Sequence, residues 1–150
     1  MRRTDREIRD PEAIESVIRG ADVCRLAFSE AGIPYLVPLC FGYRKGVLYF
    51  HSALEGRKLD LIKRKPKVCF EMDMDHVLVR TADRCTMHYR SVIGFGKAAL
   101  VEDAVEKQEA LDLIMHHYHQ EPFAYPVATL ERTAIIRVEI DEMTGKANGC

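Results

Sequence analysis

The chain has 150 residues, of which 47% are hydrophobic and 30% charged, and its formal net charge is −1. This balance predicts a single folded domain over residues 1–150 with a substantial core. It argues against a nucleic-acid-binding protein that relies on bulk electrostatics, because such proteins carry a clear basic excess. A membrane protein is not expected either, since no apolar run approaches the ~18 residues of a transmembrane helix.

The first residues and the cysteines indicate in which cellular compartment the protein is expected. The charged start of the chain has no hydrophobic segment of the kind that a signal peptide carries. The five cysteines are an odd number, and no two have the CxxC spacing of a metal or redox site. A cytoplasmic protein with reduced thiols is therefore expected.

The first third of the chain predicts one helix followed by strands. Asp10 and Pro11 are residue types that favour the cap and the first position of a helix, and Gly20 would end it. Pro38 cannot donate a hydrogen bond within a sheet, so it is expected at an edge, at a bulge or beside something other than a strand. Apolar alternation predicts three strands, over 22–29, 34–43 and 47–52. A turn at 44–46 joins the second strand to the third.

The middle of the chain predicts a short helix and two longer strands. The helix covers 56–65 and ends before Pro66, and clean alternation then predicts a strand over 67–75. Residues 76–85 have no assignment. A long strand is predicted over 86–101, and a bend or bulge is expected at its glycines, Gly94 and Gly96.

The last third predicts one more helix and one more strand. Asp103 and Glu106 resemble a capping box, and apolar spacing continues that helix through 111–118. Two prolines, Pro122 and Pro126, break the chain before a final strand over 133–141. About six strands with two or three helices, joined mainly by hairpins, predict a mostly antiparallel sheet or barrel with flanking helices.

Residues 47–58 carry the most informative pattern. His51 and Ser52 form a polar pair at a strand end, and Arg57 and Lys58 follow in a turn that opens a helix. Cations beside the positive end of a helix dipole suit an anionic cofactor. The alternative is a solvated helix start with ordinary surface charges.

Two other clusters have simpler interpretations. His116 and His119 lie three residues apart and could chelate a metal from one helical face, together with the neighbouring His117. No cysteine or paired acidic ligand is near in sequence, so polar residues at a helix end are favoured and no metal is predicted. The other cluster consists of Glu71, Asp73 and Asp75. We interpret it as the solvated face of a strand rather than as a carboxylate cluster that catalyses hydrolysis.

Six runs in one order cover nearly the whole chain and match a known pattern: 35–43, 46–53, 55–60, 65–70, 89–97 and 140–146. Together they resemble the pyridoxamine-phosphate-oxidase-like flavoproteins, and more closely the nitroimidazole-resistance branch of that family. The resemblance implies a mostly β fold with flanking helices, a six-stranded antiparallel split β-barrel of the FMN-binding kind. It also implies a homodimer with FMN at the subunit interface.

The resemblance assigns cofactor contacts to Val37, Pro38, Leu39, Phe50, His51, Ser52, Arg57, Lys58, Ser91 and Val92. The backbone of 37–39 would run beside the isoalloxazine ring, which gives a reason for a proline there. Residues 51–52 would lie at the flavin and its ribityl chain, and 57–58 would hold the phosphate. Residues 91–92 would complete the part of the site that surrounds the ribityl chain and the phosphate.

The resemblance also implies an activity. A reduced nicotinamide, NADH or NADPH, would reduce FMN, which would pass electrons to a small acceptor such as a nitroimidazole. His51 is the candidate catalytic acid, and a hydrogen-bonded histidine at a strand end is its alternative role. Aromatic residues that could line the acceptor pocket are Tyr35, Phe41, Tyr118, Phe123 and Tyr125.

Two alternatives stay open. The protein could bind flavin, haem or deazaflavin as a carrier, sensor or store without turnover, or it could be a scaffold dimer that has lost its cofactor. Oxidation of pyridoxamine phosphate is not expected. The pyridoxamine-phosphate oxidases proper end in an Arg- and His-bearing segment that binds this substrate, and residues 146–150 lack such a segment.

Overall fold

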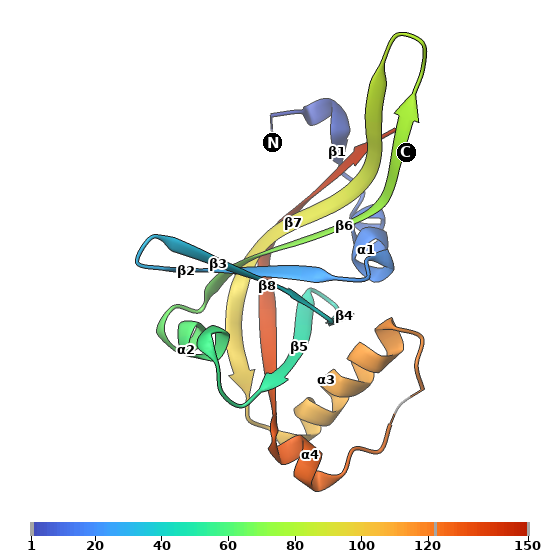
Figure 1. The fold of residues 1–150 in the computed structure, drawn as a ribbon. Helices are drawn as coiled ribbons and strands as arrows, with labels where there is room; N and C mark the ends of the chain where they lie inside the picture. Colours follow the sequence, from blue (N-terminus) through green and yellow to red (C-terminus); the bar gives the residue numbers. More distant parts are fainter. Residues whose placement is uncertain (1, 122, 150) are drawn as a thin grey trace.

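An open antiparallel sheet forms the body of the protein (Figure 1), whose computed structural model describes residues 2–121 and 123–149. Its strand order is β3-β2-β6-β7-β8-β5-β4, and β1 pairs with β8. The strands are β1 (Glu7–Ile8), β2 (Cys24–Glu30), β3 (Ile33–Leu39), β4 (Gly42–Arg44), β5 (Val47–Ala53), β6 (Lys67–Arg80), β7 (Cys85–Val101) and β8 (Thr133–Asn148).

Helices flank this sheet at different places, and the last two lie together near β5 (Figure 1). They are α1 (Pro11–Gly20), α2 (Arg57–Arg64), α3 (Ala104–His117) and α4 (Val127–Glu131), after a 3₁₀ turn at Thr4–Arg6. None of those described combines the length and the apolarity needed to cross a membrane.

The predicted fold class is confirmed, because the protein is mostly antiparallel β with flanking helices and its sheet does not close. Eight strands replace the expected six. The expected strand over 34–43 is divided at residues 40–41 into β3 and β4, and the short β1 adds to β8. The unassigned residues 76–85 continue β6 to a hairpin and begin β7, and Pro122 lies outside the described residues.

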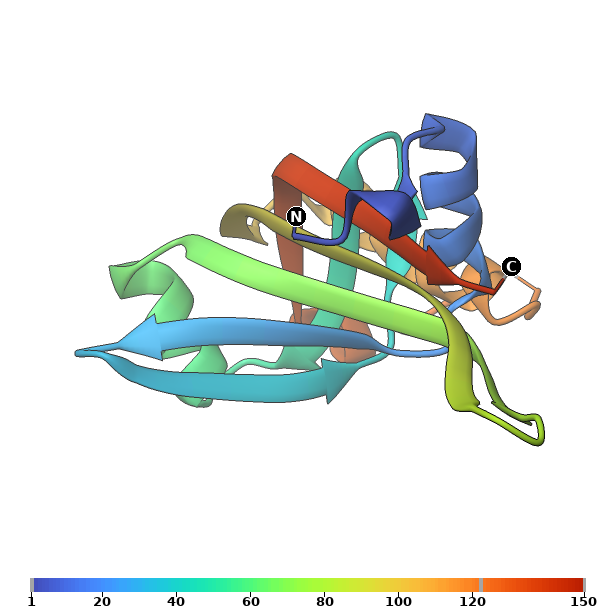
Figure 2. The same cartoon turned by 90° about the horizontal axis from the view of Figure 1, so that it is seen from above.

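The local signals at the turns and caps are confirmed. Asp10 accepts a hydrogen bond from the Glu12 N–H at 3.1 Å, and Asp103 accepts one from the Glu106 N–H at 2.8 Å. Pro38 lies on β3, an edge strand of the sheet. No strand pairs with the outer side of an edge strand, so a proline costs no hydrogen bond on that side. Figure 2 shows the β2–β3 hairpin alongside β6, with β3 outermost.

The sheet bends at its glycines, as expected. The pairing of β7 with β8 shifts register between Phe95 and Gly96. A Cβ atom on Gly94 would lie 2.3 Å from the ring of Phe70 and 2.7 Å from the Glu142 carbonyl oxygen. The close approach of these groups therefore requires glycine at position 94.

Strand β5 is covered on both faces. Its alternate residues Leu48 and Phe50 join the main core inside the sheet, where both side chains are fully buried. On the other face Tyr49 packs in a second cluster with Leu111 of α3 and Ile135 of β8. Helix α3 thus closes the outer face of β5.

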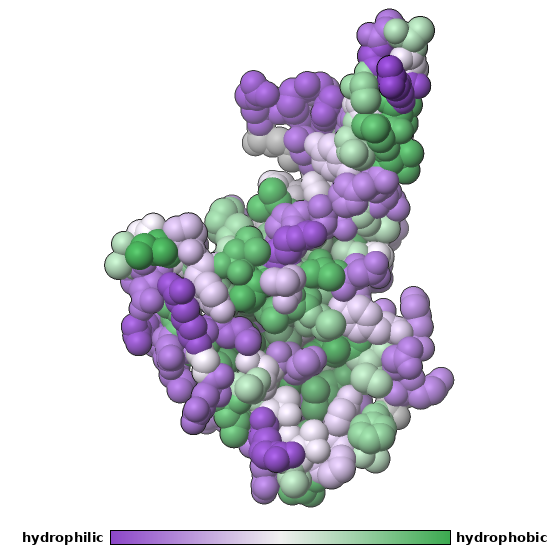
Figure 3. Space-filling view, viewed as in Figure 1, coloured by the Kyte–Doolittle hydropathy of each residue, from purple (hydrophilic) through white to green (hydrophobic). Residues whose placement is uncertain are grey.

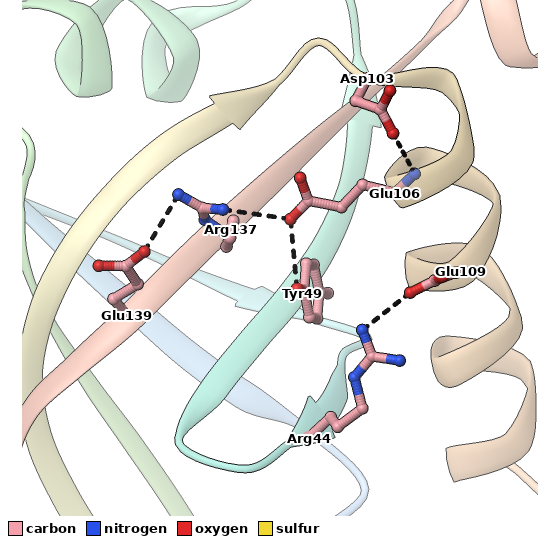
Figure 4. A network of polar contacts seen from close by, with 7 residues as sticks. All are labelled: Arg44, Tyr49, Asp103, Glu106, Glu109, Arg137 and Glu139. Atoms are coloured by element: carbon pink, nitrogen blue, oxygen red, sulfur yellow. Dashed lines mark hydrogen bonds and ion pairs between the residues drawn. The ribbon is translucent and has the colours of Figure 1, made fainter.

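A polar network holds α3 in that position (Figure 4). Glu106 of α3 accepts hydrogen bonds from the Tyr49 hydroxyl and the Arg137 guanidinium, each at 3.3 Å. Arg44 beside β5 donates to Glu109, one turn further along α3, at 2.9 Å. The helix is therefore fixed to β5, β4 and β8 by charge as well as by apolar contact.

We expect Gly94→Ala to lower the free energy of unfolding by about 2–3 kcal/mol, because the new methyl group overlaps the Phe70 ring and a backbone oxygen. Urea unfolding followed by circular dichroism measures it. Lys97→Ala, at an exposed position of the same strand, is the control and should change stability by less than about 0.5 kcal/mol. Equal stability of the two variants would contradict the packing described for the bend.

Candidate functional site

Three segments converge where β5 ends. The guanidinium of Arg57, the first residue of α2, lies 4.7 Å from the ring centre of Tyr35 on β3. The positive charge of Lys58 acts on His51 near the end of β5. The structure thus brings together β3, the end of β5 and the start of α2, which carry most of the predicted contacts.

Arg57 and Lys58 are available to a ligand. Neither forms an ion pair with another residue in the ranges that the structure describes. Gly56 caps the helix with φ 136° and no side-chain hydrogen bond, so the first amide groups of α2 have no earlier turn to donate to. Two cations beside a helix start match the charge and donor requirements of a phosphate group.

Ser52 is a buried polar group without a partner. Its side chain is 8% exposed, and its Oγ makes no hydrogen bond to any described residue. A buried hydroxyl without a partner costs about 1–3 kcal/mol, so such groups normally find one. A polar ligand beside the start of α2 would supply that partner, and the ribityl chain of FMN has hydroxyl groups suited to it.

His51 points to the opposite face of β5 from Ser52, because successive strand residues alternate. There it contacts a pocket that Leu111 and Ile114 of α3 help to line. Desolvation by its surroundings, followed by the positive charge of Lys58, lowers the pKa of the imidazole. The ring is therefore biased toward its neutral form, which offers one donor and one acceptor.

The side chains of residues 37–39 are only partly accessible to a ligand. Val37 and Leu39 are half-buried against the main core, and Pro38 is exposed. Because β3 is an edge strand, the backbone groups on its outer side pair with no described strand. Those groups could bind the polar edge of a flat ligand. The side chains of Phe50 and Val92 are fully buried in the core, which leaves only their backbone for such contacts.

Ser91 and Val92 lie away from the end of β5 within one chain. Along the ladder His51 pairs with Ile135, which pairs with Val101. Ser91 lies ten residues from Val101 on β7, and ten residues of strand span about 30 Å. Within one chain these two predicted contacts are therefore separated from His51, whereas the strand register places the neighbouring Ile93 in line with Pro38 across β6 and β2.

The histidines at the end of α3 have a structural explanation. The His117 ring lies 4.1 Å from the Phe41 ring, and its Nε2 is 2.8 Å from the Ala21 carbonyl oxygen. His116 and His119 are exposed. The described residues contain no group of three histidine, cysteine or acidic side chains placed to hold a metal ion.

The acidic residues of β6 form ion pairs, which the sequence did not indicate. Arg25 contacts Glu71 at 2.9 Å and Asp73 at 2.6 Å, and Arg90 contacts Asp75 at 2.6 Å. The expected solvated face is therefore a half-buried charged network between neighbouring strands.

The predicted aromatic lining is divided among three places, because Tyr35 lies under Arg57 and the other four residues form two further groups. Tyr125 borders the pocket beside His51, and Phe123 packs edge-on against it at 5.1 Å. Phe41 and Tyr118 lie elsewhere: Phe41 is fully buried, and the Tyr118 hydroxyl donates to the Asp22 carbonyl oxygen at 2.7 Å. Burial raises the pKa of Tyr118 to about 12, which suits a structural hydrogen bond.

The sequence did not reveal the residues that complete this pocket, which are Leu111, Ile114, Met115, Thr129 and Thr133. Their helical spacing on α3 resembles that of ordinary core residues, and α4 gave no periodic signal at all. Only the placement of α3 and α4 over β5 turns them into a pocket wall.

Comparison with protein families identifies one match. The model of the family described as pyridoxamine 5'-phosphate oxidase matches residues 10–147. No curated protein matches the sequence.

Solved structures share the fold over nearly the whole chain. A proposed 5-nitroimidazole antibiotic resistance protein from Bacteroides thetaiotaomicron is 37% identical, with a TM-score of 0.88; the match covers 94% of this chain and 86% of that one. The flavocytochrome Anf3 from Azotobacter vinelandii is 20% identical, with a TM-score of 0.82 and coverage of 100% and 72%. The FAD and haem binding protein from Mycobacterium smegmatis is 18% identical, with a TM-score of 0.81 and coverage of 97% and 74%. At these lower identities the likeness concerns the fold.

We expect Lys58→Met to raise the pKa of His51, because it removes a positive charge that opposes protonation of the ring. The value should stay below that of an ordinary histidine, since desolvation, the larger cause, remains. Titration of the His51 ring protons by NMR measures the shift. Lys63→Met, at an exposed position of the same helix, is the control; an equal shift in both variants would refute a local effect of Lys58.

Proposed function

The chain belongs to the pyridoxamine 5'-phosphate oxidase family, and on that premise we propose that it is a cytoplasmic FMN-dependent reductase. NADH or NADPH would supply the electrons, and a small nitroimidazole-type compound would accept them. The similarity to the Bacteroides protein supports this acceptor class. The strongest support is the unpartnered Ser52 hydroxyl at the end of β5, together with two cations at the start of the following helix that form no ion pair in the described ranges.

The residues divide the work of holding the cofactor. Arg57 would bind the phosphate as a two-pronged donor, and Lys58 would add a point charge. Ser52 would donate to or accept from the ribityl chain, and the outer backbone of 37–39 would align the ring. Bound FMN supplies the hydride and electron chemistry, while the protein supplies position and hydrogen bonds.

His51 is the residue placed to handle a proton. It lies between the start of α2 and the pocket beneath α3, and it is biased toward the neutral form near pH 7. A neutral imidazole can donate a hydrogen bond from one ring nitrogen and accept at the other, so it can orient an acceptor. To deliver a proton, the ring must first take one up from solvent, and the lowered pKa makes the protonated ring a stronger acid.

A homodimer would complete the site. The separation of Ser91 from His51 along β7 is spanned if Ser91 and Val92 come from a second copy. Exposed apolar residues on the same strand support an interface there, because Ile93 is 46% exposed and Phe95 is 40% exposed. Figure 3 shows apolar residues on the projecting arm of β6 and β7, where Val77, Leu78 and Met87 are exposed.

A non-catalytic flavin, haem or deazaflavin binding protein is the second candidate. Two structures with this fold are named for flavin and haem together, which favours it as the alternative. An absorption spectrum taken before and after anaerobic NADH and NADPH separates the two. Flavin bands near ~370 and ~450 nm that bleach support the reductase, whereas bound flavin that stays oxidised supports the carrier.

The cations are tested by Arg57→Ala/Lys58→Ala. We expect FMN affinity to fall about a hundredfold or more, because two charge-assisted contacts to the phosphate are lost. Lys63→Ala/Lys65→Ala removes the same charge from exposed positions at the other end of α2 and should keep the affinity of the wild type. Flavin fluorescence quenching measures both; equal affinities would remove the phosphate site from α2.

Ser52→Ala should have opposite effects on two quantities. The flavin-free protein should keep its stability or gain about 1 kcal/mol, because an unpaired buried hydroxyl is removed. FMN affinity should fall, because the ligand loses a hydrogen bond. Urea unfolding and flavin titration measure the pair of effects, and a loss of stability in the flavin-free protein would show that Ser52 has a partner within the chain.

A further inference from the structure

Arg57 is exposed at the start of α2, yet no neighbour neutralises its charge. Two carboxylates are near in sequence, Glu55 and Asp60, and the second has the three-residue spacing at which helical side chains commonly pair. Neither forms an ion pair with Arg57, whose N–H groups donate to no residue in the described ranges. The guanidinium lies instead over the ring of Tyr35, 4.7 Å from the ring centre.

The ring of Tyr35 is itself held in place. Tyr35 on β3 pairs with Phe28 on β2, and the centres of the two rings are 5.9 Å apart. Phe28 is buried in the main core, and the half-buried Tyr35 packs against that core. The Tyr35 hydroxyl makes no hydrogen bond to a residue that the structure describes, so its contact with Arg57 is a contact of the ring.

Such a contact restrains an arginine without occupying its hydrogen-bond donors. A guanidinium is attracted to the face of an aromatic ring, and its N–H groups lie in its own plane, where they remain free to donate to a phosphate. A carboxylate partner would occupy the same donors and cancel the charge. Because a long exposed side chain loses conformational entropy when it binds, an arginine that is already restrained binds an anion more tightly.

We propose that Tyr35 is a positioning residue for the phosphate of FMN, because its ring holds the Arg57 guanidinium at the start of α2 with its charge and its donors free. The inference rests on the proposed FMN function and extends it. Tyr35 would touch neither the phosphate nor the flavin ring, which differs from the acceptor lining that the sequence suggested. The preference of the protein for FMN over riboflavin, which lacks the phosphate, should therefore depend on Tyr35.

A purely structural role of Tyr35 would act through the position of α2. The other end of this helix is tied to the same hairpin, where Arg64 contacts Glu30 of β2 at 2.6 Å. Three buried side chains also hold the helix against the core: Leu59, Leu61 and Ile62. Glu30→Gln loosens the same helix from the same hairpin without changing Arg57 or its ring contact, so it is the control for a structural role.

The test compares the affinities of flavin-free protein for FMN and for riboflavin, measured by quenching of flavin fluorescence. Tyr35→Leu should weaken FMN binding about tenfold and riboflavin binding less than about twofold, because only the phosphate contact is affected. Tyr35→Phe keeps the ring, and it should bind both flavins like the wild type, as should Glu30→Gln. In an Arg57→Ala background, Tyr35→Leu should not weaken FMN binding further, because it acts through Arg57.

An equal loss of FMN and riboflavin binding in Tyr35→Leu would show contact with the flavin ring or damage to the fold, and it would overturn the inference. Unchanged FMN binding in Tyr35→Leu, an equal loss in Tyr35→Phe or Glu30→Gln, or a further loss in the Arg57→Ala background would overturn it too. A wild type that binds neither flavin would contradict both the inference and the proposed function. Bound FMN that nicotinamides fail to reduce would contradict the reductase alone and leave the role of Tyr35 in place.

Discussion

The long antiparallel pairing of β6, β7 and β8 is the constraint on which the rest of the structure depends. Strand β7 pairs with β6 on one side and with β8 on the other for most of its length, and Gly94 lets the sheet bend where Phe70 crosses it. This pairing fixes α2 and the end of β5 near one end of β7. It fixes Ser91 toward the other end, which separates it from His51 within one chain.

The second constraint is the alternation of side chains along β5. Ser52 faces the buried side of the strand with Leu48 and Phe50, whereas His51 faces the pocket beneath α3. The strand end therefore presents different residues on its two faces, and Lys58 lowers the proton affinity of His51. The Glu106 network matters to function because it holds α3 over that face.

The sequence was sufficient for features that depend on local chemistry. Caps at Asp10 and Asp103, the edge position of Pro38 and the bend at the β7 glycines were all predictable, because each follows from one residue type and its neighbours. The pocket was not predictable, since Thr129 and Leu111 become neighbours only through tertiary packing. The ion pairs of Arg25 depend likewise on strand order, which alternation alone does not give.

Mixed dimers test most directly whether two chains build one flavin site. Arg57→Ala/Lys58→Ala removes the phosphate contacts of one chain, and Ser91→Glu places a negative charge on the contact proposed to come from the other. Each variant alone should bind little FMN. Unfolding and refolding them together should restore flavin to about a quarter of the sites, because half of the dimers are mixed and each has one intact site. No recovery in the mixture, or full flavin binding by Ser91→Glu alone, would contradict a site shared between two chains.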